Sequence, residues 1–193
     1  TTRARVLNAT IEHLAEFGYG RTTTVEVAER AGVSRGALVH HFPTRSDLVL
    51  SALEYLCELR LAELERAIAE LSKAEDHLSA FVDLVWTTFN GPLFAAQLEL
   101  WIAARTDPEL YAGLYPLERG FGKRLNQLCA DALGADPASG YFYEITKHLM
   151  RGMAVERILK SDEGERLAVL EHWKQTAKTQ LGRPAGGKRR TRV

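Results

Sequence analysis

Residues 17–48 read FGYGRTTTVEVAERAGVSRGALVHHFPTRSDL, the most informative stretch of the sequence. It holds the end of one helix, two short helices and the start of a fourth. Thr23 and Glu26, three residues apart, predict a capping box that opens a helix over 24–31. Gly32 suits the left-handed backbone that ends such a helix. The stretch therefore predicts a short helix that stops at a tight glycine turn.

A third helix follows this turn. Ser34 is a strong N-cap for residues 35–41. Leu38 and Phe42 lie four residues apart and would face inward, and Pro43 ends the helix. Two short helices joined by a glycine-containing turn form a helix-turn-helix, whose second helix enters the major groove of DNA.

The outward residues of this second helix suit the edges of DNA bases. Arg35 can donate two hydrogen bonds to guanine or one to a phosphate, Gly36 lets the backbone approach closely, and Val39 can contact a thymine methyl group. Backbone amides beside Ser34 are suited to hold phosphates. The other expected DNA contacts are Thr23, Thr24, His40, His41 and Arg45.

From Thr22 to Phe42 the sequence resembles the signature of the TetR family of bacterial repressors, Thr-Thr/Ser-x-x-x-Ile-Ala-x-x-Ala-Gly-Val-Ser-x-Gly-x-Leu-Tyr-x-His-Phe. The resemblance is specific over residues 1–48; beyond them only the number, order and length of the helices are similar. It implies base contacts by Arg35, Gly36 and Val39 and phosphate contacts by Thr24, His40, His41 and Arg45. Val27 replaces Ile, and Val39 replaces Tyr, so the operator preference of relatives does not carry over.

The charges are distributed unevenly along the 193 residues, of which 46% are hydrophobic and 26% charged. Residues 1–48 carry six Lys+Arg and five Asp+Glu, residues 49–182 carry 14 and 20, and residues 183–193 carry five and none. The middle, with a net charge of −6, would be repelled by a phosphate backbone. The two ends are left to meet nucleic acid.

Other function classes lack the features that they need. Cys57 and Cys129 are far apart and have no CxxC or Cys/His ligand spacing, which disfavours a disulfide or zinc site and suits a reducing cytoplasm. For Glu144 and His148 a helical surface pair or a core contact is favoured over metal ligation. No stretch approaches the ~20 apolar residues of a membrane span. No nucleophile elbow, zinc motif or dinucleotide fingerprint indicates an enzyme, and we expect neither a metal nor a cofactor.

Apolar residues recur at helical spacing almost throughout, so the predicted fold class is all-α. Glycine, proline and capping residues divide the chain into about nine helices, the first ended by Gly18 and Gly20. The expected helices are 2–17, 24–31, 35–41, 45–72, 75–90, 92–105, 107–134 with a break near Pro116, 137–160 and 163–181.

The expected organisation is a helix-turn-helix DNA-binding domain over 1–48, a helical effector-binding and dimerisation domain over 49–181, and a disordered basic tail over 182–193. The tail resembles a partial AT-hook, although a solvated tail is the favoured interpretation.

The second domain concentrates large side chains in its middle helices. Aromatic walls suit a buried site for a small apolar or aromatic molecule, and the resemblance implies an effector pocket there. We expect it to be lined by Trp86, Phe89, Phe94, Leu98, Trp101 and Phe121. The alternative is that these side chains fill the core. Glu99, Arg105 and Asn126 are candidates to orient a polar end of the effector, although a surface charge or a cap is the favoured interpretation of each.

The helices expected over 137–160 and 163–181 are apolar on more than one face, as Ile145 and Leu159 illustrate. A helix that is apolar beyond one stripe needs a second partner, so we expect a four-helix seam between two subunits, with packing inside one chain as the alternative. A two-fold homodimer presents two recognition helices to a palindromic operator on double-stranded DNA.

The sequence therefore favours an effector-responsive repressor whose effector it does not name. The rivals are an effector-independent architectural DNA-binding protein and a helical enzyme or binding module with a helix-turn-helix-like start.

Overall fold

The computed structural model describes residues 1–71, 74–134, 137–159 and 162–181. In chain order its elements are α1 (Thr2–Arg21), α2 (Thr24–Ala31), α3 (Arg35–His41), α4 (Arg45–Leu71), α5 (His77–Thr88), α6 (Pro92–Ala104), α7 (Pro108–Leu133), α8 (Pro137–Glu156), a 3₁₀ turn (Arg157–Leu159) and α9 (Glu163–Leu181). These ranges contain no strand, which confirms the all-α prediction. The predicted basic tail over 182–193 lies outside the described residues.

The chain divides into two compact units. The first comprises residues 1–66 and 88–125, and the second comprises residues 67–87 and 126–193. The predicted domain boundary at residue 48 falls within the first unit. No helix in the described ranges combines the length and the apolar character that a membrane crossing requires.

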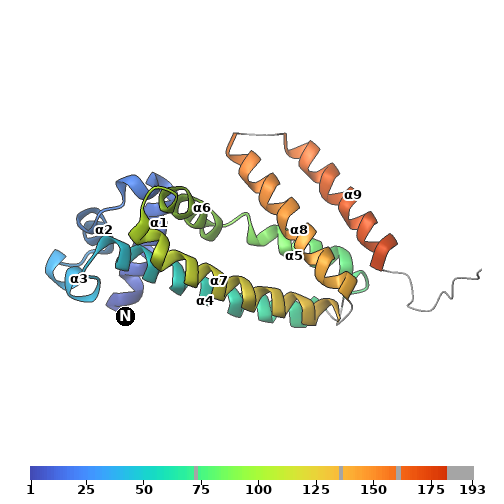
Figure 1. The fold of residues 1–193 in the computed structure, drawn as a ribbon, viewed down its shortest axis with the longest axis horizontal. Helices are drawn as coiled ribbons and strands as arrows, with labels where there is room; N and C mark the ends of the chain where they lie inside the picture. Colours follow the sequence, from blue (N-terminus) through green and yellow to red (C-terminus); the bar gives the residue numbers. More distant parts are fainter. Residues whose placement is uncertain (72–73, 135–136, 160–161, 182–193) are drawn as a thin grey trace, which may run out of the picture. The chain divides into compact units, whose positions relative to one another are not determined.

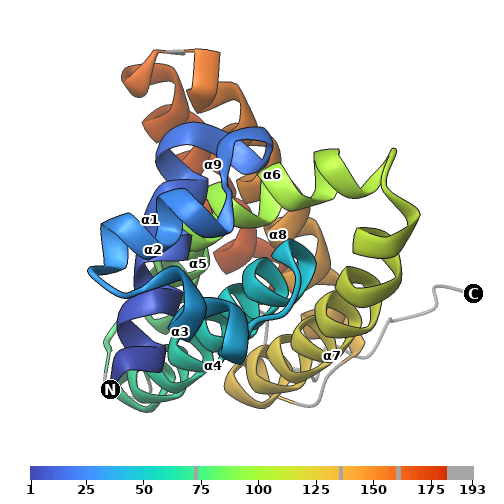
Figure 2. The same ribbon diagram turned by 90° about the vertical axis from the view of Figure 1, so that its left-hand side faces the viewer.

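One core of the first unit joins α1, α2, α3 and the start of α4, which Figures 1 and 2 show gathered together. Its buried residues are Val6, Leu7, Ala9, Ile11, Val27, Ala28, Leu38, Phe42, Leu48 and Ala52. Each large apolar side chain buried here contributes about 1.5–3 kcal/mol to folding. This core fixes α3 against its neighbours.

A second core of the same unit packs α1 and α4 against α6 and α7. The predicted break near Pro116 is wrong, because α7 runs through this residue without interruption. Leu114 is buried in the core and Leu117 packs against it. This packing on either side of Pro116 offsets the roughly 3 kcal/mol that proline costs inside a helix.

Gly18 interrupts α1 near its end, with φ 76° and ψ 171°. The prediction that Gly18 and Gly20 end the helix is therefore half correct. Only Gly18 leaves the helical region, and the helix resumes as far as Arg21.

The second unit contains α5, α8 and α9, with α8 and α9 antiparallel and side by side (Figure 1). The Phe142 and Trp173 rings stack with centroids 5.4 Å apart, and the Trp173 indole N–H donates to Thr146 Oγ1 at 2.8 Å. Lys174 pairs with Asp83 at 2.7 Å, which connects α9 to α5.

Candidate nucleic-acid interface and effector region

The start and the end of α2 have the predicted caps. Thr23 Oγ1 accepts from the Glu26 backbone N–H at 3.3 Å, and the Glu26 carboxylate accepts from the Thr23 backbone N–H at 3.3 Å. The hydrogen bond from the Thr23 side chain also lowers the pKa of Glu26. Gly32 is left-handed, with φ 62° and ψ 41°. α2 is therefore capped at both of its ends.

The inner face of α3 determines which side chains face outward. Ser34 caps the helix by accepting from the Ala37 N–H at 3.2 Å. Leu38 and Phe42 are only 1% and 3% exposed. The exposed residues of α3 include the predicted contacts Arg35, Gly36, Val39, His40 and His41. The structure thus brings together on one short helix all the residues predicted to read bases.

The flanking candidates have different surroundings. Thr23 is exposed but engaged in its capping box, and Thr24 is half-buried at the first position of α2. Arg45 is half-buried: its guanidinium donates from Nη2 to the Tyr19 carbonyl oxygen and lies 3.8 Å from the Tyr19 ring centroid. A phosphate contact by Arg45 remains a prediction, and this contact with Tyr19 was not foreseen.

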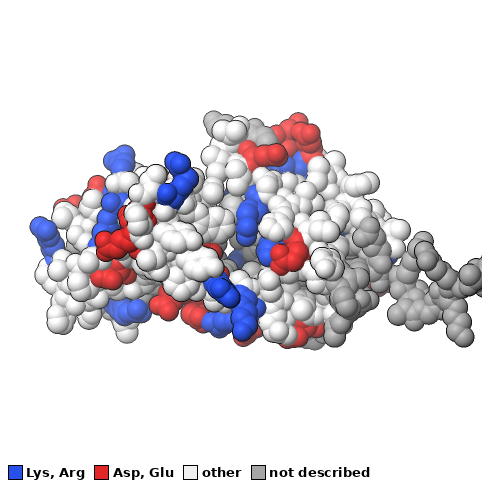
Figure 3. All heavy atoms as spheres, viewed as in Figure 1, with Lys and Arg blue, Asp and Glu red and all other residues white. Residues whose placement is uncertain are grey.

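Two arginines at the start of α1, Arg3 and Arg5, are further candidates for contact with DNA that the sequence analysis did not include. The Arg3 guanidinium lies 5.9 Å from the centroid of the Phe42 ring, so the start of α1 lies beside the end of α3. Arg3 and Arg5 are exposed, and the first turn of α1 carries no acidic residue. On the face drawn in Figure 3, basic and acidic side chains are interspersed over α1–α3. In the sequence, the feature that could have indicated them is a pair of early arginines without acidic neighbours.

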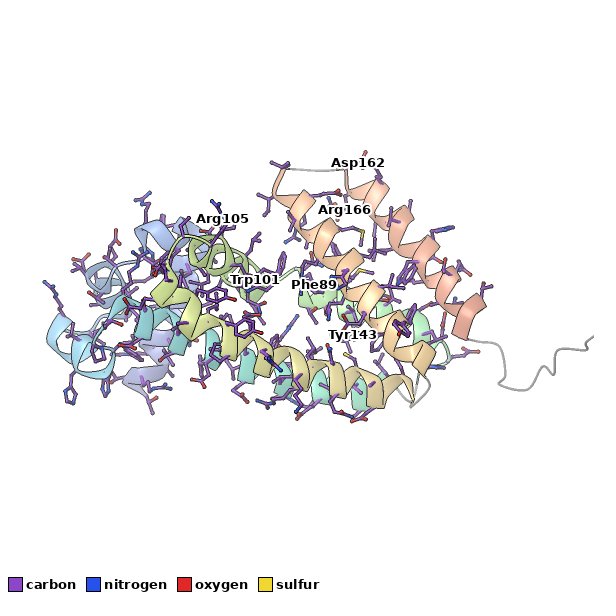
Figure 4. The ribbon with its side chains drawn as sticks, viewed as in Figure 1. Phe89, Trp101, Arg105, Tyr143, Asp162 and Arg166 are labelled. Carbon is purple, nitrogen blue, oxygen red and sulfur yellow. The ribbon has the colours of Figure 1, made fainter. Side chains whose placement is uncertain are left out.

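Three of the predicted effector-lining residues form an aromatic cluster in the first unit. The Phe89 and Phe94 ring centroids are 5.2 Å apart, and those of Phe94 and Trp101 are 6.4 Å apart, both nearly perpendicular. Phe89 and Phe94 are buried, whereas Trp101 is half-buried (Figure 4 labels Phe89 and Trp101). Leu98 is half-buried on α6, and Trp86 belongs to the second unit.

A groove of about 480 Å³ lies between α4 and α7 in the first unit. Of the predicted lining residues, only Phe121 borders it. Leu50, Pro116 and Leu117 are among its apolar walls, with Asp47, Glu54, Glu58 and Arg124 among its polar residues. Burial raises the pKa of Cys57, another wall residue, to about 12. Sequence reasoning missed this groove because its concavity depends on how two helices pack.

Glu144 and His148 behave as a surface pair. His148 Nε2 lies 3.7 Å from the Glu144 carboxylate, which also pairs with Lys147 at 2.7 Å and accepts from Asn126 at 3.0 Å. In the part of the chain that the structure describes, no three His, Cys, Asp or Glu side chains are grouped to hold a metal ion.

Known proteins resemble the chain at its start and over most of its length. Residues 6–52 match the family model of bacterial regulatory proteins, tetR family. The HTH-type transcriptional regulator CymR of Pseudomonas putida is 32% identical over 168 residues, which cover 84% of this chain and 82% of CymR. The regulator BetI of Escherichia coli is 32% identical over 113 residues, 56% of this chain and 58% of BetI.

Solved structures share the fold at lower sequence identity. The multidrug binding protein EbrR, in complex with imidazole, superposes with a TM-score of 0.67 at 22% identity and covers 98% of both chains. A putative TetR-family transcriptional regulator of Mesorhizobium loti superposes with a TM-score of 0.72 at 16% identity, covering 94% of this chain and 95% of that one.

Proposed function

The chain belongs to the TetR family of bacterial transcriptional regulators, and from this premise we propose that it is a cytoplasmic homodimeric repressor. The dimer binds a palindromic operator, and a small apolar or aromatic effector releases it. The 1–48 segment reads the DNA, while the helices after it bind the effector and form the dimer.

The exposed face of α3 is the observation that carries this proposal. Arg35, Gly36 and Val39 are exposed while Leu38 and Phe42 are buried, and both ends of the preceding turn are capped. A short helix held in this way is suited to enter a major groove, where Arg35 would bond guanine and Val39 would contact a thymine methyl group.

Exposed apolar residues of α8, α9 and the turn between them support the dimer. Leu170 and Ala177 are buried within the chain, but many others are exposed: Tyr141, Ile145, Val155, Ile158, Leu159, Leu167 and Val169. Exposed apolar surface on two adjacent helices favours a partner, and a second copy of the same pair supplies a matching surface about a two-fold axis.

The groove between α4 and α7 supports effector binding. Its volume of about 480 Å³ lies within the range of small-molecule sites, and Phe121 offers an aromatic wall. Asp47, in the first turn of α4, also borders it, so an occupant would contact the helix that directly follows α3. Linkage then requires operator DNA to lower effector affinity by the same factor by which the effector lowers DNA affinity.

Selection of bound duplexes from a random pool tests the proposal. We expect enrichment of an inverted repeat whose half-site centres are ~10 bp, or a multiple of this, apart, because two recognition helices of a dimer meet one face of the duplex. Enrichment of a single site without symmetry would contradict the dimeric arrangement. Binding to the pool with no enriched sequence would favour an architectural protein instead.

A further inference from the structure

The kink in α1 is held by a carboxylate from α6. The Tyr19 backbone N–H donates to Glu99 Oε2 at 3.1 Å, across 80 positions in the sequence. Gly18 makes this contact possible in two ways. Its φ of 76° interrupts the helix, and a Cβ at this position would lie 2.7 Å from Glu99 Oε2. The non-helical backbone at Gly18 and its lack of a side chain therefore leave room for the Glu99 carboxylate.

The other side of Tyr19 is held by α4. The Arg45 guanidinium donates to the Tyr19 carbonyl oxygen, which also accepts from the Thr22 N–H at 3.0 Å, and it lies 3.8 Å from the Tyr19 ring centroid. Arg45 is the first residue of α4, and only residues 42–44 separate α4 from α3. Two consecutive contacts thus lead from α6, through the kink, to the helix that follows the recognition helix.

We propose that Glu99 is a positioning residue for the recognition helix. By fixing Tyr19 it fixes the partner of Arg45, and thereby the direction in which α4 leaves α3. A displacement of α6 would then pass to α3 through the end of α1 as well as along α4. This inference rests on the proposed function, because it gives α3 its role in DNA binding.

Hydrogen–deuterium exchange of the full chain, without DNA, tests the positioning role first. In Glu99→Ala, exchange should rise ~10-fold in residues 18–22, where a charge-assisted hydrogen bond is lost. It should also rise ~2–30-fold in residues 42–48, the range that measured coupling energies imply. Glu99→Gln keeps an acceptor for the Tyr19 N–H and should restore both segments. Glu65→Ala removes an exposed carboxylate from α4 and is the control. Faster exchange in 18–22 alone, with 42–48 unchanged, would overturn the proposal.

Exchange with a duplex selected from the random pool tests the transmission. In the unsubstituted chain, DNA should slow exchange in residues 24–41 and also in 92–104 of α6. Glu99→Ala should retain the first effect and lose the second, and Glu99→Gln should retain both. Equal protection of α6 in Glu99→Ala and the unsubstituted chain would overturn the inference. Absence of protection at 24–41 in the unsubstituted chain would instead contradict the proposed DNA binding, while the exchange without DNA still decides the positioning role.

Discussion

Arg35 is the residue whose replacement best separates reading of a base from contact with the backbone. It is exposed at the first position of α3, directly after the Ser34 cap. We expect Arg35→Ala to cost ~1–3 kcal/mol of operator binding and to relax the preference at one base pair of each half-site. Titration against the selected duplex and its single-base variants measures both effects. Equal weakening for every variant would show that Arg35 contacts only phosphate.

Asp76 gives a prediction for acid stability within the second unit. Hydrogen bonds from Lys178 and from Ser79 lower the pKa of Asp76 from 3.8 to about 2. A lowered pKa in the folded state stabilises the protein above the unfolded value, and this contribution is lost as pH falls from about 4 to about 2. Asp76→Asn should therefore lower the Tm at pH 7, and the difference from the unsubstituted chain should vanish towards pH 2.

Two features make the Asp76 comparison specific. Asp76 Oδ1 accepts from the Ser79 N–H at 3.2 Å, and asparagine caps a helix about as well, so the substitution isolates the charge. Glu75→Gln, at the neighbouring exposed carboxylate, is the control. A Tm difference that persists unchanged at pH 2 would contradict the ion-pair explanation.

At the scale of the element, two glycines of α7 test the groove. Gly120 borders the groove whereas Gly122 does not, and a Cβ at either position meets no atom within 4 Å. Gly120→Leu should fill the groove and abolish effector binding, while Gly122→Leu leaves it intact; both should improve helix propensity. The measurement is the thermal stabilisation caused by a compound found by screening. At 100 times its Kd, this compound should raise the free energy of unfolding of the unsubstituted chain by about 2.7 kcal/mol. Retained binding in Gly120→Leu would place the effector elsewhere.

The elements also show how far the sequence predicts this fold. Thr23, Gly32 and Ser34 act within three or four residues of themselves, so residue type alone predicted the ends of α2 and α3. By contrast, the course of α7 through Pro116 depends on packing against distant helices, and local signals missed it.

In the candidate site, too, local features could be predicted from the sequence and long-range contacts could not. The prediction that Leu38 and Phe42 face inward is confirmed, because helical spacing determines which face of α3 is buried. The hydrogen bond from Arg45 to the Tyr19 carbonyl oxygen joins residues 26 positions apart, and the one from the Tyr19 N–H to Glu99 joins residues 80 positions apart. Spacing along the chain carries no information on such contacts.

At the scale of the whole molecule, exposed isoleucines on two helices offer a matched test of the dimer. Ile145 of α8 is 53% exposed and Ile102 of α6 is 58% exposed. Sedimentation of the unsubstituted chain should give about twice its 21.5 kDa mass. Ile145→Glu would bury a charge in the proposed seam and should yield monomers, whereas Ile102→Glu should remain dimeric. A dimeric mass for both variants would contradict a seam that contains Ile145 of α8.

Sequence-specific reading through α3 is tested by the affinity of the full chain for two duplexes of equal length at one salt concentration. One carries the inverted repeat obtained by selection, and the other has both half-sites scrambled. We expect two chains per duplex and binding to the repeat that is at least ~10³-fold tighter than to the scrambled duplex, as for specific DNA-binding proteins. Equal affinity for the two duplexes would contradict a regulator that reads its operator through α3.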